Sequence, residues 1–532
     1  MATSAASAPR RTGLASAAAI LMVGFVLSRL LGLLRLSLQA GVLRTVGHDA
    51  TAFTAAITIP DTVFTVVSGG ALGSSFIPVF AGLLEKGDEE EAWRVASGVM
   101  NGVFLVLLVA IGVAELAAPW LVGFETNAPD HDLTVTLTRI MLLQPLFLAI
   151  GGILMGLYNS YHRFILPAIA PLVYNIAAII GLALVPIVHH TVALAAWGVT
   201  IGALLQVVVM APGLIAFRRH VRPGAGLAAA GTREVARLMT PRIVGQAGIQ
   251  LTGVVTVALA NKAFAEGASG ALRLAANLMA LPVGIFGSAI ATAAFPTLTG
   301  QAARGDLAAL GETLSRTLRT MMFFAIPSAV ALVVLRYPVI DVLFHRGAFQ
   351  ESDTDFVAAA LLLYAAGVPV WTAVELLPRA FFALKDTWTP VLVNLVTLAT
   401  ACALSVLAVY LAHGNAMTGI GLISGALSLT VLMEVVWLGL ILRKRVVNLG
   451  LRELGLSTLR SLVASEAMGV ALLALLYLWR RLGPSGVPGD TLLLIIAVPL
   501  GGAVYIGWAH LLDAPELATA RALLLARLRR SR

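Results

Sequence analysis

The sequence predicts an all-α polytopic membrane protein with 14 transmembrane helices, arranged as two parallel six-helix repeats forming a V-shaped cleft, plus two C-terminal helices. Hydrophobic residues make up 59% of the 532-residue chain, only 12% of residues are charged, and the mean hydropathy is +0.92. A soluble domain of this length cannot bury so much apolar surface, whereas a bilayer accommodates it in helices of about 20 apolar residues. The first six apolar segments also resemble the next six at matched positions.

The apolar segments are expected to be helices, because their runs are too long for barrel strands and do not alternate with a period of two. The first one carries Arg29 and Arg35 and is longer than the apolar region of a cleavable signal, so it counts as a span. The single cysteine, Cys402, lies within a predicted span, so disulfides play no part. In chain order, the expected spans are 14–42, 51–84, 93–119, 133–160, 164–188, 191–217, 238–263, 271–299, 312–336, 354–384, 388–412, 417–442, 457–480 and 490–512.

Internal duplication is visible in motifs that recur at a nearly constant offset. The pairs are Pro78-x-x-x-Gly82 with Pro296-x-x-x-Gly300, at an offset of 218, and Pro171-x-x-x-Asn175 with Pro390-x-x-x-Asn394, at an offset of 219. A third pair is Gly202-Ala203-Leu204 with Gly425-Ala426-Leu427, at an offset of 223. Six spans separate the members of each pair, and an even number keeps the direction of the chain, so the repeats are predicted to be parallel. We therefore expect an N-terminal six-helix lobe at 1–222 and a C-terminal six-helix lobe at 223–446. Two additional helices and a basic cytoplasmic tail follow at 447–532.

The distribution of basic residues predicts that both termini are cytoplasmic. When the termini and the loops after even-numbered spans are assigned to one side, that side holds 25 of the 36 Lys and Arg residues, and the other side holds seven. The net charge of +9 follows from this asymmetry and is suited to anionic lipid headgroups, so nucleic acid is not expected as a partner.

Motifs of nucleotide hydrolysis and of nucleophilic, zinc or thiol catalysis (Walker A, GxSxG, HExxH and CxxC) do not occur in the sequence. We therefore expect a membrane transporter rather than an enzyme, with no cofactor. Coupling to a monovalent cation stays open. The span at 238–263 holds no acidic residue, however, so sodium is not expected to bind there.

Two arginines in the first span are the most informative charges. An arginine at membrane depth costs about 2.5–3.5 kcal/mol on insertion, so it should face a cavity, a partner or a helix interface. Arg29 and Arg35 are six residues apart and point about 120° away from each other on a straight helix. Both line one cavity only if the helix bends, and Gly32 is the expected bend. The alternative is a structural role, with the guanidinium group bound to helix-end carbonyls or to Glu375 or Glu434.

Five sequence segments resemble the MurJ (MviN) family of the multidrug/oligosaccharidyl-lipid/polysaccharide exporter superfamily. Four of them are Ser28-Arg29-x-x-Gly32-x-x-Arg35, the stretch from Arg163-Phe164 to Asn175, Leu343-Phe-His-Arg-Gly-Ala-Phe349, and the stretch from Ala380 to Pro390. A fifth segment, Leu281-Pro282-x-Gly284 followed by Phe295-Pro296, resembles the eighth span of the family. The resemblance implies a flippase that moves lipid II, an undecaprenyl-diphosphate-linked peptidoglycan precursor, to the outer leaflet of the bacterial plasma membrane by alternating access. It implies a lipid-linked anionic substrate, with membrane lipids and cell-wall synthesis proteins as partners, and the membrane potential is the expected driving force.

The resemblance also assigns roles to individual residues. Arg29 and Arg35, with the adjacent Ser28, are expected to bind the diphosphate, because guanidinium donors match phosphate oxygens and stay charged. Arg242, after Pro241, is a further candidate, with snorkelling to the lipid headgroups as the alternative. Asn277 stands where the family carries an arginine and is expected at the substrate.

Acidic residues within the predicted spans are candidates for gating or ion pairing. They are Asp61, Glu375 and Glu434. Several positions that are charged in the family are uncharged here, which leaves a flippase for another polyprenyl-linked glycan as an alternative. A multidrug exporter of the same superfamily is a second alternative, although it would need an acidic cavity. A scaffold of the cell-wall complex is a third, and it would not need Arg29 or Arg35.

Overall fold

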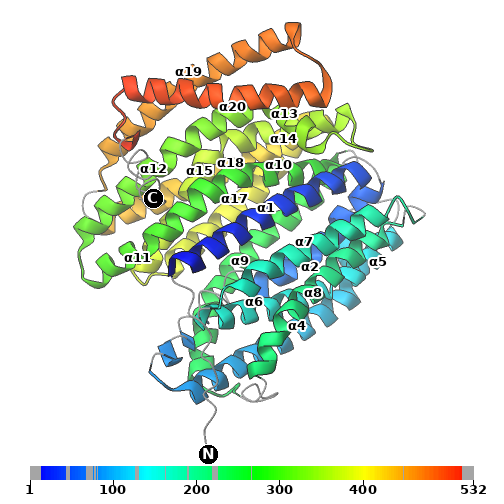
Figure 1. The fold of residues 1–532 in the computed structure, drawn as a ribbon, viewed down its shortest axis with the longest axis vertical. Helices are drawn as coiled ribbons and strands as arrows, with labels where there is room; N and C mark the ends of the chain where they lie inside the picture. The colour runs from blue at the N-terminus through cyan, green and yellow to red at the C-terminus, as the bar shows by residue number, and fades with distance from the viewer. Residues whose placement is uncertain are drawn as a thin grey trace, which may run out of the picture. The chain divides into compact units, whose positions relative to one another are not determined.

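All regular secondary structure in the described part of the chain is helical, as predicted (Figure 1). The computed structural model describes residues 14–43, 48–67, 76, 79–80, 82–84, 86–125, 131–161, 163–188, 191–217, 226–264, 267–446 and 449–517. The helices are α1 (Leu14–Leu43), α2 (His48–Val67), α4 (Glu89–Glu125), α5 (His131–Met141), α6 (Gln144–Ser160), α7 (Ile165–Leu184), α8 (Ala193–Phe217), α9 (Ala230–Ala263), α10 (Ala268–Pro282), η1 (Val283–Ser288), α11 (Ala289–Ala303), α12 (Leu307–Val334), α13 (Arg336–Phe344), α14 (Glu351–Ala366), α15 (Val368–Ala373), α16 (Leu377–Ala383), α17 (Trp388–Leu411), α18 (Ala416–Arg445), α19 (Leu451–Leu482) and α20 (Gly486–Leu511).

The chain is a multi-pass membrane protein by the length and composition of its helices. Among the described residues, 11 helices are long and apolar enough to cross a bilayer. A twelfth span results if α14 and the stretch Val368–Ala383, which bend by 56° at their junction, are counted together. The predicted spans at 14–42 and 51–84 overlap α1 and α2, which are not among these, so the total of 14 stays a prediction.

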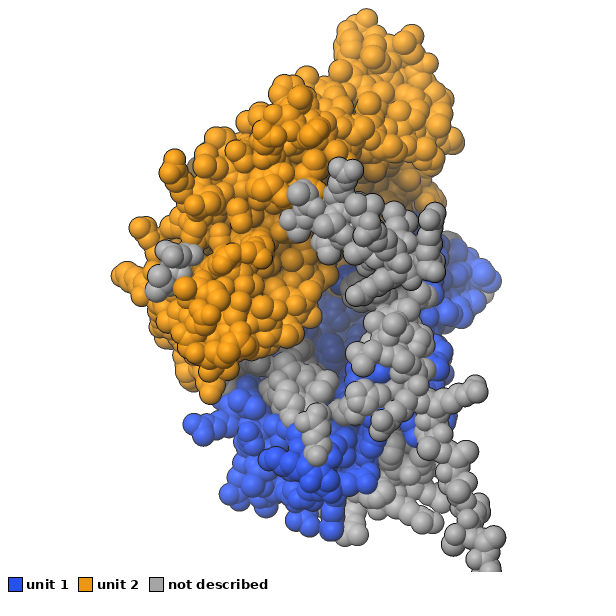
Figure 2. All heavy atoms as spheres, turned by 60° about the vertical axis from the view of Figure 1, so that its left-hand side comes forward, with its two compact units in different colours: residues 1–42, 52–124, 129–250 blue, residues 43–51, 125–128, 251–532 orange. Residues whose placement is uncertain are grey.

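Two compact units divide the chain (Figure 2). Unit 1 comprises residues 1–42, 52–124 and 129–250, and unit 2 comprises residues 43–51, 125–128 and 251–532. The change from unit 1 to unit 2 therefore falls inside α9. The predicted three-part division at residues 222 and 446 stays a prediction.

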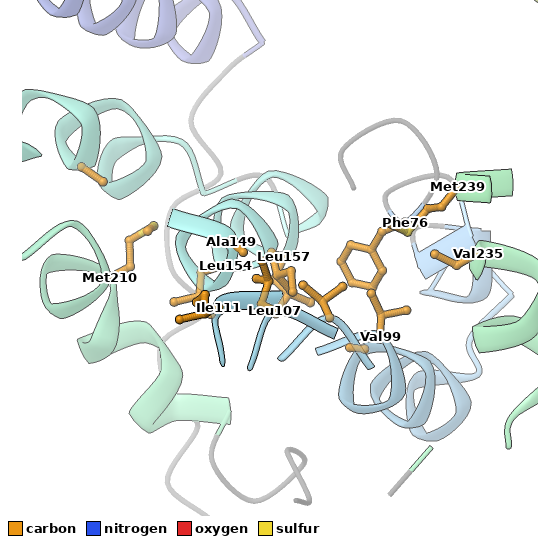
Figure 3. Packing of buried hydrophobic residues seen from close by; sticks show 14 of the residues in the cluster. Phe76, Val99, Leu107, Ile111, Ala149, Leu154, Leu157, Met210, Val235 and Met239 are labelled. Carbon is orange, nitrogen blue, oxygen red and sulfur yellow. The ribbon is translucent and has the colours of Figure 1, made fainter. Parts of the chain in front are cut away.

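Unit 1 is held together by close helix packing around an apolar core. Helix α7 packs along α8, where a Cβ added to Gly181 would lie 2.6 Å from the Cα of Gly198. Small residues allow such approach where lipid supplies no hydrophobic drive between helices. The Tyr158 hydroxyl donates to the carbonyl of Met210 at 2.7 Å and joins α6 to α8. Leu107 and Ile111 of α4 lie beside Leu154 and Leu157 of α6 in the core (Figure 3).

Unit 2 contains two groups of packed helices. Helices α17 and α18 pack together, and α18 also packs against α14. Helix α19 packs against both α12 and α20, and the Tyr505 hydroxyl donates to the carbonyl of Phe323 at 2.6 Å. This bond satisfies a polar tip in an apolar core and connects α20 to α12.

The helix that begins at Ala268 changes its winding after Pro282. Residues Val283–Ser288 form a single π-helical segment, η1, between α10 and α11. Proline lacks the N–H for the regular ladder and its ring displaces a carbonyl, so a local change of winding is expected there. Such π-segments are frequently found at functional sites.

Candidate functional site

Arg35 on α1 is held by Tyr174 on α7. An Arg35 terminal nitrogen donates to the Tyr174 hydroxyl at 3.2 Å, and the guanidinium carbon lies 5.5 Å from the centre of the Tyr174 ring. The Gln144 side-chain amide at the start of α6 donates to the same hydroxyl at 3.4 Å. Gln144 is only 2% exposed, and its Oε1 has no hydrogen-bond partner in the part of the chain that the structure describes. Three helices of unit 1 therefore meet at one tyrosine hydroxyl.

Ser28 lies on the same face of α1 as Arg35, because seven residues make almost two full turns. The Asn175 amide donates to the Pro171 carbonyl at 2.9 Å and reaches the Ser28 hydroxyl at 3.5 Å. Further along the helix, a Cβ added to Gly24 would lie only 2.8 Å from the Cβ of Ala168. One face of α1 thus packs closely on α7, and the repeat motif that contains Asn175 forms part of the contact.

Arg29 is exposed, whereas Arg35 is partly buried. Helix α1 runs without interruption from Leu14 to Leu43, so the two guanidinium groups leave it in different directions. Asp61 on α2 is partly buried. Arg242 belongs to α9 by its backbone, and its side chain lies outside the described part of the structure.

In unit 2, Asn277 uses its amide within its own helix. Its side-chain nitrogen donates to the carbonyl of Arg273, one turn earlier, at 2.8 Å. The side chain is partly buried on α10. An asparagine bound in this way has fewer donors to offer an anion than the arginine that the family places there.

Glu375 lies at the junction between α15 and α16 and pairs with Arg379, which was not predicted as a site residue. Arg379 donates to a Glu375 carboxylate oxygen at 3.4 Å and to the carbonyl of Ser288, the last residue of η1, at 3.3 Å. The i,i+4 spacing of the pair is the sequence signal that could have identified it. The pair connects the bent span to the π-helical segment.

Glu434 on α18 is 8% exposed, and the side-chain amide of Asn394 on α17 lies near it and favours its charged form. A carboxylate in such a position needs a donor to offset the loss of water. Asn394 belongs to the same repeat motif as Asn175. In both units, therefore, the asparagine of the Pro-x-x-x-Asn motif contacts a polar side chain of another helix.

The Ala380–Pro390 motif forms a charged contact between α16, α17 and the end of α18. Asp386 accepts from the Thr389 amide at 3.0 Å and from the Thr389 hydroxyl at 2.5 Å, and it pairs with Arg445. Arg445 also lies 5.6 Å from the ring centre of Phe381. Burial alone would raise the pKa of Asp386, but the bonds from Thr389 and Arg445 outweigh it and lower the pKa below 3.8.

The arrangement in unit 1 is suited to binding an anion. Beyond Tyr174, the Arg35 guanidinium has no further partner among the described residues, so donors remain for a ligand. Neither Tyr174 nor Gln144 is predicted from the sequence, because both read as ordinary residues of apolar helices. Within the described ranges, no group of three His, Cys, Asp or Glu side chains could hold a metal ion.

The family model and the curated relatives agree on one family. The model of "Lipid II flippase MurJ" matches residues 45–495. A probable lipid II flippase MurJ of Rhizobium tropici is 30% identical over 396 residues, which cover 71% of this chain and 73% of that protein. The corresponding protein of Bdellovibrio bacteriovorus is 29% identical over 511 residues, 94% of each chain. The fold resembles a solved structure of lipid II flippase MurJ in its inward closed conformation, with a TM-score of 0.75 and 22% identity over 93% of this chain and 98% of that one.

Proposed function

This chain belongs to the MurJ family, and we propose that it flips lipid II from the inner to the outer leaflet of the bacterial plasma membrane. The family model spans residues 45–495, and the relative from Bdellovibrio bacteriovorus, named a probable lipid II flippase, matches 94% of the chain. This full-length agreement carries the proposal. The chain is accordingly a membrane transporter and not an enzyme.

Arg29, Arg35 and Ser28 are the proposed ligands of the diphosphate, and they would bind it in succession. Arg29 is exposed and would bind first; Arg35, which leaves α1 in another direction and is held at Tyr174 with donors remaining for a ligand, would bind next, with Ser28 on the same helix face. Guanidinium groups suit a diphosphate because they stay charged and present several donors in one plane. Ser28, next to Arg29, would be a further hydroxyl ligand once Asn175 releases it.

The remaining candidates have secondary roles in this proposal. Arg242 would attract the anionic headgroup, and Asn277 would contact the part of the substrate beyond the diphosphate. Asp61 and Glu434 would exchange partners during the transport cycle. For Glu375, the pairing with Arg379 at the junction of the bent span favours a role in gating.

We infer two parallel six-helix repeats, 14 spans and cytoplasmic termini, with rocking of the lobes as the transport step. Matched packing supports the repeat: α7 lies along α8 in unit 1, as α17 lies along α18 in unit 2. The helix is also interrupted within two spans that correspond in the two repeats, the predicted fourth span at residues 142–143 and the predicted tenth span at residue 367.

An inside-negative membrane potential favours outward movement of negative charge by about 2.3 kcal/mol per charge per 100 mV, so no ATP is required. Enzymes that consume lipid II outside are proposed partners.

A flippase for another polyprenyl-linked glycan is the second candidate. It is favoured by Asn277, which replaces a charged residue of the family pattern and uses its amide within α10. A different headgroup would need a different set of contacts there, while the diphosphate and Arg35 would remain the same.

Complementation tests the proposal. A bacterium depleted of its own lipid II flippase would receive the parent chain, Arg29→Ala, Arg35→Ala or the control Arg304→Gln, which alters an exposed arginine in the turn after α11. We expect rescue by the parent and the control, and loss of rescue in either alanine variant at matched expression. Failure of a well-inserted parent would exclude lipid II and favour the second candidate.

A further inference from the structure

A crevice of about 340 Å³ lies within unit 1, away from the face of α1 that holds Arg35. Its walls come from Gly98 to Val106 of α4 and from Thr232 to Ile243 of α9, with Leu227 and Val67 completing them. Val99, Val235 and Met239 gather around Phe76 beside it (Figure 3). The lining is mostly apolar, with Thr232, Arg233 and Thr240 as its polar side chains, and the volume is at the lower end of the range of about 300–1,000 Å³ for ligand pockets.

Two glycines of α4 shape the crevice, one by close packing and one by leaving room. At Gly98 an added Cβ would lie 2.2 Å from the carbonyl oxygen of Gly226, so only glycine permits this approach. The Thr232 hydroxyl donates to the same carbonyl at 2.8 Å and fixes the turn before α9 against α4. At Gly102 a Cβ would make an ordinary contact with Leu227, at 3.6 Å, so a longer side chain there would enter the crevice.

The crevice is open to lipid on one side. Val106 lines it and is 54% exposed. Its neighbours Leu105 and Val109 on α4 are exposed as well. On a helix that is apolar enough to cross the bilayer, such residues face hydrocarbon. A lipid chain can therefore enter the crevice sideways without leaving the membrane.

Positive charge lies at the other end. Arg233 lines the crevice and Arg237 follows one turn later, and both are exposed. Within the described part of the chain, neither guanidinium has a hydrogen-bond or ion-pair partner. Glu234 is the one nearby acid in sequence, and it points about 100° away from Arg233 around the helix.

We propose that this crevice is a binding site for an anionic phospholipid of the bilayer. One acyl chain occupies the apolar crevice, and the phosphate of the headgroup binds Arg233 and Arg237. Basic side chains beside a pocket between membrane helices are the arrangement that recognises anionic lipid heads. The occupant is a bilayer lipid rather than the transported substrate, because the crevice has no room for a glycan and lies on helices other than α1. The site stands whether or not the proposed function is correct.

Native mass spectrometry of the detergent-purified full chain tests this site. The probes are phosphatidylglycerol and phosphatidylcholine with the same acyl chains. The variants are Gly102→Leu, which fills the crevice, and Arg233→Gln with Arg237→Gln, which removes the charge. Their matched controls are Gly112→Leu, on the same helix with nothing within 4 Å of an added Cβ, and Arg304→Gln. Thermal unfolding of each variant shows whether it is folded.

The expected result is retention of one phosphatidylglycerol by the parent and both controls, with much weaker retention of phosphatidylcholine. Gly102→Leu should abolish the retention of phosphatidylglycerol. Each arginine that is replaced should weaken phosphatidylglycerol binding about fivefold. Equal retention of the two lipids, or equal retention by folded crevice variants and their controls, would overturn the proposal. Displacement of phosphatidylglycerol by equimolar undecaprenyl phosphate would overturn it too, because the substrate's own tail would then be the occupant.

Discussion

The contact between Arg35 and Tyr174 shows how an arginine is held within an apolar helix bundle. The hydroxyl accepts a hydrogen bond at 3.2 Å, and the ring lies 5.5 Å from the charge. Both interactions orient the guanidinium group without neutralising it, since tyrosine carries no charge. The group therefore keeps its affinity for an anion.

Replacement of Tyr174 by phenylalanine separates the two interactions. The ring is retained and the hydroxyl is lost, so both Arg35 and Gln144 lose a hydrogen-bond acceptor. We expect the rate of lipid II translocation to fall by up to about tenfold, because a hydrogen bond to a charged group contributes about 1.5 kcal/mol. This loss should be smaller than that caused by Arg35→Ala. Adding Tyr174→Phe to Arg35→Ala should cost little more. Tyr410→Phe, at a side chain that is 75% exposed, is the control and should transport normally.

Asp386 gives a prediction about pH. Its pKa is lowered in the folded protein, so its contacts stabilise the fold above the ordinary value near 3.8, and that stability is lost as the pH falls through the lowered pKa. Asp386→Asn should cost about 1 kcal/mol at pH 7, since it weakens a partly exposed ion pair and a bond to the first turn of α17. Melting temperatures of parent and variant should converge in strong acid. A constant difference down to pH 2 would show that the charge is irrelevant.

At the scale of helices, breaks occur where proline or glycine enters an apolar run. The sequence 354–384 is expected to be one span, yet the structure ends α14 at Ala366 and bends by 56°. Pro369 near the start of α15 lacks an N–H, which explains the interruption. The adjacent Gly367 has a second role, because an added Cβ would lie 2.5 Å from the hydroxyl oxygen of Ser428 on α18.

Gly367→Ala should therefore destabilise unit 2 by about 1–3 kcal/mol, the usual cost of overpacking. The clash pushes α14 from α18 and strains the bend. Gly439→Ala on α18 is the matched control, since nothing lies within 4 Å of its added Cβ, and it should leave stability unchanged. Thermal unfolding in detergent measures both. If both variants unfold at the same temperature as the parent, the close approach at Ser428 is not needed for the fold.

At the scale of the whole molecule, composition and length were sufficient to predict an all-helical, multi-pass membrane protein. They could not give the exact breaks, because π-segments such as Val283–Ser288 depend on packing around a proline. For the site, the cost of burying Arg35 indicated its importance, but its partner Tyr174 lies 139 residues away and has no pattern of its own. The pairing of Glu375 with Arg379 could have been predicted from its i,i+4 spacing in the sequence. The contact of Arg379 with η1 could not, because nothing in the sequence places η1 beside it.

Topology is a property of the whole chain and can be tested directly. In a Cys402→Ala background, a cysteine at the exposed position Arg304 should lie inside, and one at the exposed position Ser485 should lie outside. A membrane-impermeant maleimide added to intact spheroplasts should label only Ser485→Cys. Labelling of Arg304→Cys instead would reverse the orientation and with it the direction of transport.

Translocation of lipid II in proteoliposomes tests the central claim most directly. Purified parent chain would be reconstituted with headgroup-labelled lipid II, and its appearance in the opposite leaflet followed with and without an imposed potential. We expect translocation well above that of protein-free vesicles, faster when the potential favours movement of negative charge, and strongly reduced in Arg29→Ala and Arg35→Ala. Translocation no faster than in protein-free vesicles, or undiminished in both arginine variants, would contradict the account.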